Sequence, residues 1–262
     1  MLSEIKRQLS NHPWQNTIHY FDTIPSTNTY AKQLAAAGAP EGTVVIADQQ
    51  TGGRGRLGRT FSSPAGMGIY MSVILRPSCF PEELMHLTCA VGVVAGDAVA
   101  TVTNVMPGIK WTNDLVIGKR KLGGILTELS VNPISGKVDW VVVGIGINCC
   151  QQPTDFPEEI RNIAISLSLP SFQRPQLMAA LIGALHTMCG HLFTKKKDIM
   201  ENFRHRCVTI GSEISILRGD DVRHGKAIGV DDDGGLQVAF PDGTERTITS
   251  GEVSIRGMYG YL

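Results

Sequence analysis

Residues 49–61 read QQTGGRGRLGRTF, and the rest of the chain is organised around this stretch. It places three arginines and four glycines between an apolar run at 43–47 and a Ser-Pro-Gly turn at 62–66. Glycine lets the backbone reach positive φ and approach a ligand closely. Arginine carries a planar fork of donors that suits carboxylate and phosphate oxygens. The stretch therefore predicts a cationic loop that folds over an anion, and we expect an activated acyl phosphate.

The composition sets no strong charge bias. The chain has 262 residues, which is long enough for one large domain or for a main domain with a small appendage. Its 24 basic residues are balanced by 24 acidic ones, which argues against a general nucleic-acid-binding surface. No apolar run approaches the roughly 18 residues of a membrane span, and residues 1–16 lack the apolar core of a signal peptide. We therefore expect a cytoplasmic protein.

The six cysteines agree with a reducing compartment, because they form no CxxC pair and a chain of this size needs no disulfides. A zinc site could be read from Cys189 with His191, or from His205 with Cys207. Both pairs lie in helix-like sequence, where residues two apart point to different faces. We expect buried or surface thiols and no metal bound by protein ligands.

Hydrophobic periodicity predicts an α+β fold. A helix is expected to begin at Ser26 or Thr27 and to stop at Gly38. The other expected elements are strands at 17–23, 43–47, 68–75 and 137–148, a hairpin of 109–117 and 121–129, and helices at 81–102, 176–193 and 195–206. Beyond about residue 209, short alternating strands and glycine-rich turns predict a small barrel. About fifty residues are few for independent stability, so we expect it to pack on the main domain.

Residues 53–58 formally satisfy the GxGxxG dinucleotide fingerprint. That fingerprint needs a helix directly after the glycines and an acidic residue about twenty positions on. Here Thr60 to Pro64 cannot open the helix, and Ser78 and Cys79 stand where the acid belongs. We reject the dinucleotide interpretation. The sequence also lacks a GxxxxGK[ST] loop, so any use of ATP must employ other machinery.

Three motifs in this order and spacing resemble those of the biotin protein ligases: the arginine loop, KWTND at 110–114 followed by Lys121, and GIGIN at 144–148. The resemblance spans 17–148, and the small C-terminal unit matches too. It implies a mixed central sheet with flanking helices over 1–208, of the class II synthetase-like type, and an SH3-like barrel over 209–262. It also implies an enzyme that converts biotin and MgATP to biotinyl-5′-AMP and then biotinylates one lysine of a biotin carboxyl carrier protein. Homodimers paired along a sheet edge occur in that family.

The residues make chemical sense of that reaction. In the first step an ionised carboxylate attacks a polyanion, which needs fixed cations rather than a general base. Arg54, Arg56, Arg59 and Lys121 fit this need. In the second step the acceptor lysine must lose a proton at neutral pH, although its reference pKa is about 10.4. A carboxylate that accepts or orients this proton is useful, and Asp114 is the candidate. A surface ion pair of Asp114 with Lys121 is the alternative.

The family positions imply two groups of binding residues. The biotin group is Ser26, Thr27, Asn28, Gln50, Gly53, Arg54, Gly55, Arg56, Lys121 and Gly124, with backbone from 144–146. The nucleotide group is Arg54, Arg56, Arg59, Phe61, Asn113, Lys121 and Asn148. Lys121, Asp114 and Arg56 are the expected catalytic residues.

The chain departs from the family at two positions. Thr112 replaces the usual proline, which loosens the turn, and Phe61 replaces a tryptophan, which predicts weaker stacking on adenine and weaker adenylate retention. Two other classes compete with the ligase interpretation. Lipoyl or octanoyl ligases and transferases lack the arginine loop, and a nucleic-acid binder would need interleaved aromatic residues. Some family members are also repressors, but the lead before residue 17 is too short for a DNA-binding head, so we expect no operator binding.

Overall fold

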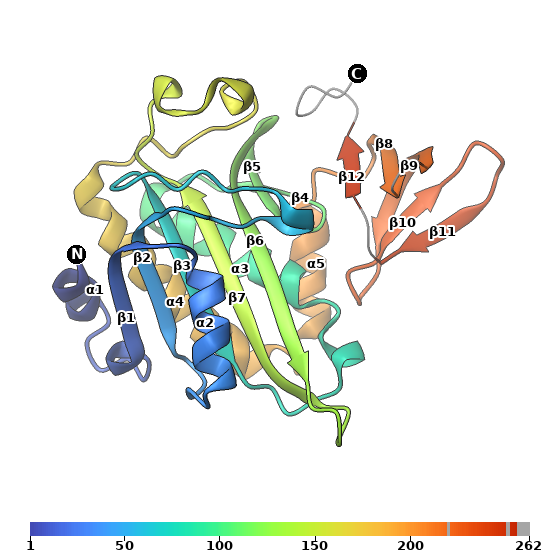
Figure 1. Ribbon diagram of the computed structural model, residues 1–262. Coiled ribbons are helices and arrows are strands. Elements are labelled where there is room, and N and C mark those ends of the chain that lie inside the picture. The colour runs from blue at the N-terminus through green and yellow to red at the C-terminus, as the bar shows by residue number, and fades with distance from the viewer. Residues whose placement is uncertain (219–220, 250–251, 256–262) are drawn as a thin grey trace.

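A seven-stranded mixed sheet forms the centre of the computed structural model, which describes residues 1–218, 221–249 and 252–255 (Figure 1). The strand order is β1-β2-β3-β7-β6-β5-β4. Strands β1 and β2 pair in parallel, and the remaining pairs are antiparallel. The strands are β1 Ile18–Ile24, β2 Val44–Gln50, β3 Gly68–Leu75, β4 Gly108–Lys110, β5 Asp114–Ile117, β6 Arg120–Val131 and β7 Val138–Asn148.

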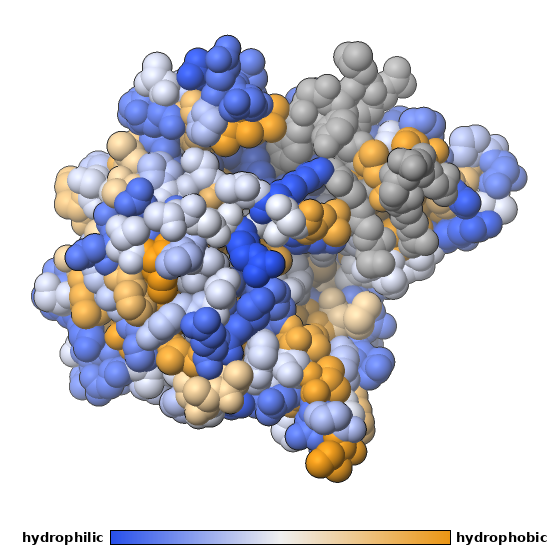
Figure 2. All heavy atoms as spheres, viewed as in Figure 1, coloured by the Kyte–Doolittle hydropathy of each residue, from blue (hydrophilic) through white to orange (hydrophobic). Residues whose placement is uncertain are grey.

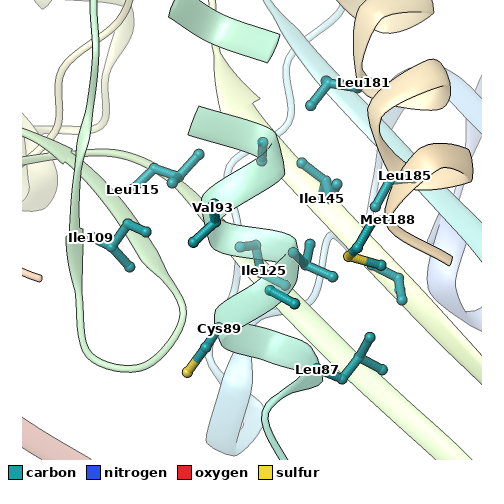
Figure 3. Packing of buried hydrophobic residues seen from close by; sticks show 14 of the residues in the cluster. Leu87, Cys89, Val93, Ile109, Leu115, Ile125, Ile145, Leu181, Leu185 and Met188 are labelled. Atoms are coloured by element: carbon teal, nitrogen blue, oxygen red, sulfur yellow. The ribbon is translucent and has the colours of Figure 1, made fainter. Parts of the chain in front are cut away.

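Helices cover both faces of this sheet. Helices α3 (Leu87–Thr103) and α4 (Arg174–His191) pack on one face, where Val93, Ile125 and Leu185 belong to the main core (Figure 3). Helix α2 (Thr27–Ala36) covers the other face with a small second core. The remaining helical elements are α1 Leu2–Gln8, α5 Lys196–Arg206, and the short 3₁₀ turns η1 Gln15–Thr17, η2 Arg56–Gly58, η3 Pro81–Leu84, η4 Pro153–Asp155, η5 Glu158–Ile160 and η6 Ser171–Gln173. The N-terminus of α2 lies over the middle of the sheet, because Thr27 and Asn28 contact Ser72 on β3, and Asn28 also contacts Glu128 on β6.

The predicted helix over 81–102 is present, but its first residues form the 3₁₀ turn η3, and after a short break α3 begins at Leu87. His86 lies at the break, and its buried ring nitrogen Nε2 is 3.0 Å from the carbonyl oxygen of Leu192. This contact with Leu192, which directly follows α4, holds the chain in place between η3 and α3. The segment Pro81–Thr103 is long and apolar enough to span a membrane, but 61% of its most apolar window is buried inside the protein, as in a core helix.

The predicted single strand over 109–117 is wrong. The chain reverses at 111–113, so that β4 and β5 pair antiparallel with Lys110 opposite Asp114. Trp111 is held at this turn by the C-terminal part of the chain: its backbone N–H donates to Thr209 Oγ1 (2.8 Å) and its Nε1 donates to Gly234 O (2.8 Å). The turn therefore depends on contacts far away in the sequence, which periodicity does not reveal.

The C-terminal part forms a five-stranded antiparallel sheet in the order β11-β10-β9-β8-β12. Its strands are β8 Glu213–Arg218, β9 Asp221–Val230, β10 Leu236–Ala239, β11 Glu245–Ile248 and β12 Glu252–Ile255. It packs on the main unit, where Lys110 Nζ donates to Val253 O (2.9 Å) and Arg204 pairs with Asp232 (3.0 Å). The predicted α+β class, with a mixed central sheet, flanking helices and a small C-terminal β unit, is confirmed.

Candidate active site

A cavity of about 180 Å³ lies where the main sheet, α2, the loop after β2 and the β4–β5 turn meet. Hydrophilic residues gather in the middle of the face that Figure 2 shows. Predicted site residues that line the cavity are Ser26, Thr27, Asn28, Gln50, Arg54, Gly55, Arg56, Arg59, Phe61, Asn113, Asp114, Lys121 and Gly124, together with Gly144 and Gly146. The structure thus brings together residues from five segments of the chain.

The arginine loop folds as a small hairpin over this cavity. Arg54 and Thr60 form an antiparallel bridge, and the backbone N–H of Gly55 donates to Arg59 O (2.7 Å). Leu57 turns the tip with φ of 55°. Arg56 Nη1 donates to Asn113 Oδ1 (2.9 Å), which ties the tip to the β4–β5 turn. The loop therefore supplies guanidinium groups to one wall of the cavity.

Asp114 and Lys121 form an ion pair inside the site, with 2.7 Å between Oδ1 and Nζ. The strand register explains the contact, because Asp114 lies opposite Gly124 on β6 and a Cβ on Gly124 would come within 3.4 Å of Lys121 Nζ. The Asp114 side chain is 12% exposed and that of Lys121 is 34% exposed. An exposed surface ion pair, the alternative drawn from the sequence, does not describe a pair that lines a cavity.

The polar end of the cavity is built at the N-terminus of α2. Ser26 caps this helix by accepting from the N–H of Thr29 (3.4 Å), and it also lines the cavity. The backbone N–H of Thr27 donates to Gln50 Oε1 (2.9 Å), and Gln50 Nε2 donates to Ser63 Oγ (3.0 Å). Helix capping and cavity lining thus coexist in the same short segment.

Two glycines of β7 make room for neighbouring side chains. A Cβ on Gly144 would lie 2.0 Å from Asn28 Oδ1, and a Cβ on Gly146 would lie 2.7 Å from the Phe61 ring. The Phe61 ring also meets Tyr70 edge-on, with 6.4 Å between centroids. Because Gly144 and Gly146 have no side chains, Asn28 and Phe61 can pack directly against β7.

Two predicted site residues do not line this cavity. Gly53 accepts from the N–H of Phe61 (3.0 Å) and closes the loop hairpin, where a Cβ would lie 2.3 Å from Phe61 O. Asn148 lines a neighbouring cavity of about 90 Å³, which shares Phe61 and Lys121 with the central one.

Sequence reasoning did not identify the side chains that form the apolar wall, which are Met71, Ile125 and Ile145. These three residues are cross-strand neighbours, since both Met71 and Ile125 pair with Ile145. The positions of Ile145 beside the GIGIN glycines and of Ile125 after Gly124 could have indicated them. Val253 also lines the cavity, but nothing in its local sequence links β12 to this site.

The cysteines do not contribute a reactive thiol. Burial raises the pKa of Cys89, Cys149 and Cys189 to about 12. Across the part of the chain that the structure describes, all six cysteines are free and none lines the central cavity. Acyl transfer through a thioester needs a thiolate at the reacting centre, so this arrangement disfavours a thiol-dependent acyltransferase.

Comparisons with known proteins agree with this geometry. Residues 20–148 match the biotin/lipoate A/B protein ligase family, and residues 209–256 match the biotin protein ligase C-terminal domain. The chain is 34% identical to the bifunctional ligase/repressor BirA of Bacillus subtilis, over 93% of this chain and 76% of that protein. It is 32% identical to the biotin–[acetyl-CoA-carboxylase] ligase of Mycobacterium tuberculosis, over 80% and 79%.

Solved structures give the same picture. The fold superposes on the Aquifex aeolicus biotin protein ligase in complex with biotin and ATP with a TM-score of 0.76, at 29% identity over 91% of this chain and 98% of that chain. It also superposes on the Leishmania major biotin protein ligase in complex with biotinyl-5-AMP with a TM-score of 0.58, at 25% identity over 89% and 98%.

Proposed function

The chain belongs to the biotin protein ligases, which are enzymes, and we propose that it activates biotin as biotinyl-5′-AMP and transfers the biotinyl group to a lysine of a biotin carboxyl carrier protein. The supporting observation is a single cavity that combines an apolar wall, a polar end, three arginines and the Lys121–Asp114 pair. We assign the polar end to the ureido ring and the cationic wall to the activated carboxylate and nucleotide. The free thiols suit a cytoplasmic site of action.

In the first step, a biotin carboxylate oxygen attacks the α-phosphorus of ATP, and the bond to the pyrophosphate leaving group breaks. Magnesium bound to the ATP substrate would neutralise part of the phosphate charge. Arg54, Arg56, Arg59 and Lys121 stabilise the charge that accumulates between the two anions. The apolar wall keeps water away from the mixed anhydride that forms.

In the second step, the neutral amine of the acceptor lysine attacks the acyl carbon, an amide bond forms and AMP leaves. Asp114 accepts or orients the proton that the amine loses. Its contact with Lys121 holds the carboxylate at the cavity wall.

The proposal is tested by incubating the protein with biotin, labelled ATP and a carrier domain. We expect biotin-dependent release of pyrophosphate and a carrier that gains the mass of one biotinyl group. Lipoate and octanoate, offered under the same conditions, test the related acyl ligases. A carrier that accepts biotin from a known ligase but gains no mass here contradicts the proposal.

We also propose that the chain does not bind operator DNA, although BirA relatives are named bifunctional ligase/repressor. Its 24 basic residues are balanced by 24 acidic residues, and Arg54, Arg56 and Arg59 line the cavity. Titration with labelled duplex DNA tests this proposal, and saturable binding at physiological salt contradicts it.

Arg56→Gly is expected to let biotinyl-5′-AMP escape about thirtyfold faster, because losing a charge-assisted hydrogen bond costs about 2 kcal/mol. The variant also loses the Asn113 contact that holds the loop tip (2.9 Å). Biotin on a bystander protein, measured without carrier, reports the escape. Arg56→Lys keeps the charge without the fork and is expected to be intermediate. Unchanged bystander labelling by Arg56→Gly contradicts this role.

Asp114→Asn is expected to lower carrier biotinylation by about 10²-fold, while biotin-dependent pyrophosphate release falls much less. The amide keeps the size of the side chain but no longer accepts a proton from the acceptor lysine. Single-turnover measurements of each step separate the two effects. Asp139→Asn, which removes an exposed carboxylate from β7, is the control. Equal losses in both steps would reassign Asp114 to positioning.

A further inference from the structure

The central sheet splits between β2 and β3 at the end that borders the cavity. The pairing of these two strands ends at Ala47 opposite Tyr70 in the part of the chain that the structure describes. Beyond this point the end of β2 still pairs with β1, and the start of β3 pairs with β7. Residues 51–67, which carry the arginines, therefore connect the two sides of a split in the sheet.

The two ends of the arginine loop are attached to opposite sides of this split. The backbone N–H of Thr51 donates to Ile24 O (3.1 Å), which ties the outgoing end to β1. The backbone N–H of Cys150 donates to Met67 O (2.8 Å), which ties the returning end to the residues that follow β7. The position of the loop over the cavity therefore depends on how far apart the two sides of the split are held.

One buried side chain joins the two sides. Arg174 is the first residue of α4, and its side chain is 3% exposed. Its Nε and Nη2 both donate to Gly68 O, at 3.0 and 2.7 Å, and Nη2 also donates to Asp48 Oδ1 at 3.0 Å. Asp48 lies on β2 directly after the last pair with β3, and Gly68 is the first residue of β3. A planar guanidinium holds two such acceptors at a fixed separation, which a single ammonium group does not reproduce.

Arg174 reaches the split from a firmly packed element. Leu177, Leu181 and Leu185 of α4 belong to the main core and are at most 1% exposed (Figure 3). The backbone of Arg174 is therefore fixed on one face of the sheet, and its side chain can hold β2 and β3 in place.

Neither helix stability nor core packing explains a cation at this position. The N-terminus of a helix carries a partial positive charge, so an arginine in the first turn is unfavourable there. Burying a guanidinium also costs free energy, and apolar side chains of similar volume often replace buried ion pairs without loss of stability. Only a donor of this kind can link Gly68 O to the Asp48 carboxylate. The role of Arg174 therefore concerns the loop that lies between these two residues.

We propose that Arg174 and Asp48 are positioning residues, whose ion pair fixes the separation of β2 and β3 at the split and so holds the arginine loop over the cavity. The part of this inference that concerns retention of biotinyl-5′-AMP rests on the proposed function. Neither residue lines the central cavity, so both act through the loop. When the pair is broken, the two ends of the loop can separate, Arg56 withdraws from the cavity and the adenylate escapes.

Limited trypsin digestion of the folded protein, with the cleavage sites identified by mass, is the first test. Trypsin cleaves after arginine and lysine, and it reaches residues 54–59 when the loop opens. Arg174→Lys keeps the buried charge but loses the fork, and it is expected to raise cleavage within 54–59 about tenfold. Asp48→Asn keeps an acceptor oxygen without the charge, and about a threefold rise is expected. Cleavage after Lys137, in the exposed turn between β6 and β7, is the internal reference and is expected to stay unchanged.

Escape of biotinyl-5′-AMP, measured as bystander labelling without carrier, is the second test. Because both processes require the loop to open, each variant is expected to raise escape by the same factor as cleavage within the loop. Arg206→Lys is the matched control, since Arg206 also joins a carbonyl oxygen, that of Val93 (3.2 Å), to a carboxylate, that of Asp97 (2.7 Å). These contacts lie on α3 and not at the loop, so wild-type loop cleavage and wild-type escape are expected.

A merely structural role of Arg174 raises cleavage within the loop and after Lys137 by the same factor, which overturns the inference. Loop cleavage at the wild-type rate in both variants also overturns it. If Arg174→Lys does not fold, Asp48→Asn decides, because the Asp48 side chain is partly exposed. If the wild-type protein biotinylates a carrier while loop cleavage is unchanged in the variants, only this inference fails. If the wild type forms no biotinyl-5′-AMP, the proposed function fails, and the digestion still decides whether Arg174 holds the loop.

Discussion

Lys121→Gln is expected to slow biotin-dependent pyrophosphate release by about 10²–10³-fold, because it removes a fixed cation from the place where two anions are brought together. The glutamine keeps most of the side-chain length, and its neutral amide can still donate a hydrogen bond to Asp114, which contacts Lys121 Nζ at 2.7 Å in the wild-type protein. Calorimetry with biotin alone is expected to show a much smaller change, since the charge matters most when the phosphate is present. Pre-steady-state pyrophosphate release measures the effect.

Lys119→Gln is the control for this experiment. Lys119 is exposed in the turn between β5 and β6, two residues before Lys121, and it does not line the cavity. We expect its rate to equal that of the wild-type protein. If Lys121→Gln and Lys119→Gln slow pyrophosphate release by the same small factor, Lys121 contributes only a general positive potential. Its proposed role as a charge stabiliser in the first step is then wrong.

Gly144→Ala is expected to abolish measurable biotin binding and to lower the free energy of unfolding by about 1–3 kcal/mol, the usual cost of overpacking a close-packed interior. The added methyl group would lie 2.0 Å from Asn28 Oδ1 and 2.8 Å from its Cγ. Asn28 is 5% exposed and hydrogen-bonded to Glu128 and Ser72, so it can move away only by breaking these hydrogen bonds. Biotin titration and denaturant unfolding measure the two effects.

Gly183→Ala provides the matched comparison. Gly183 lies within α4, and a Cβ there meets no atom within 4 Å. Alanine favours a helix over glycine by up to about 1 kcal/mol, so this variant is expected to be as stable as the wild type or more stable and to bind biotin normally. A Gly144→Ala protein that binds biotin with wild-type affinity contradicts the assigned close approach.

The features that could be predicted from the sequence are those with local causes. The glycine and arginine spacing of 49–61 predicts a cationic loop, and the register of a hairpin brings Asp114 near Lys121 once the turn at 118–119 is recognised. A hydroxyl residue before a helical pattern predicts the cap at Ser26. In each case the residues that act together are close in sequence or fixed by one turn.

The features that escaped prediction depend on contacts between distant segments. The turn at 111–113 is held by hydrogen bonds of Trp111 to Thr209 and Gly234. The alternation of residue types over 109–117 therefore could not predict this turn. Ser72 is one small residue in an apolar strand, and Glu128 is one carboxylate in a hairpin. Their significance arises only when the fold places both beside Asn28.

The junction between the two sheets also affects how far the sequence of the C-terminal sheet can diverge and whether that sheet can be deleted. Lys110 and Trp111 reach across it to the carbonyl oxygens of Val253 and Gly234, and every amino acid carries a carbonyl oxygen. Substitutions in the C-terminal sheet can therefore accumulate while the junction persists, provided that the backbone path is kept. Deleting that sheet is a different matter, because an indole and an ammonium group would lose their partners beside the reacting centre. A minimal ligase cut from this chain has to retain the sheet even though, among the residues of the sheet that the structure describes, Val253 alone lines the cavity.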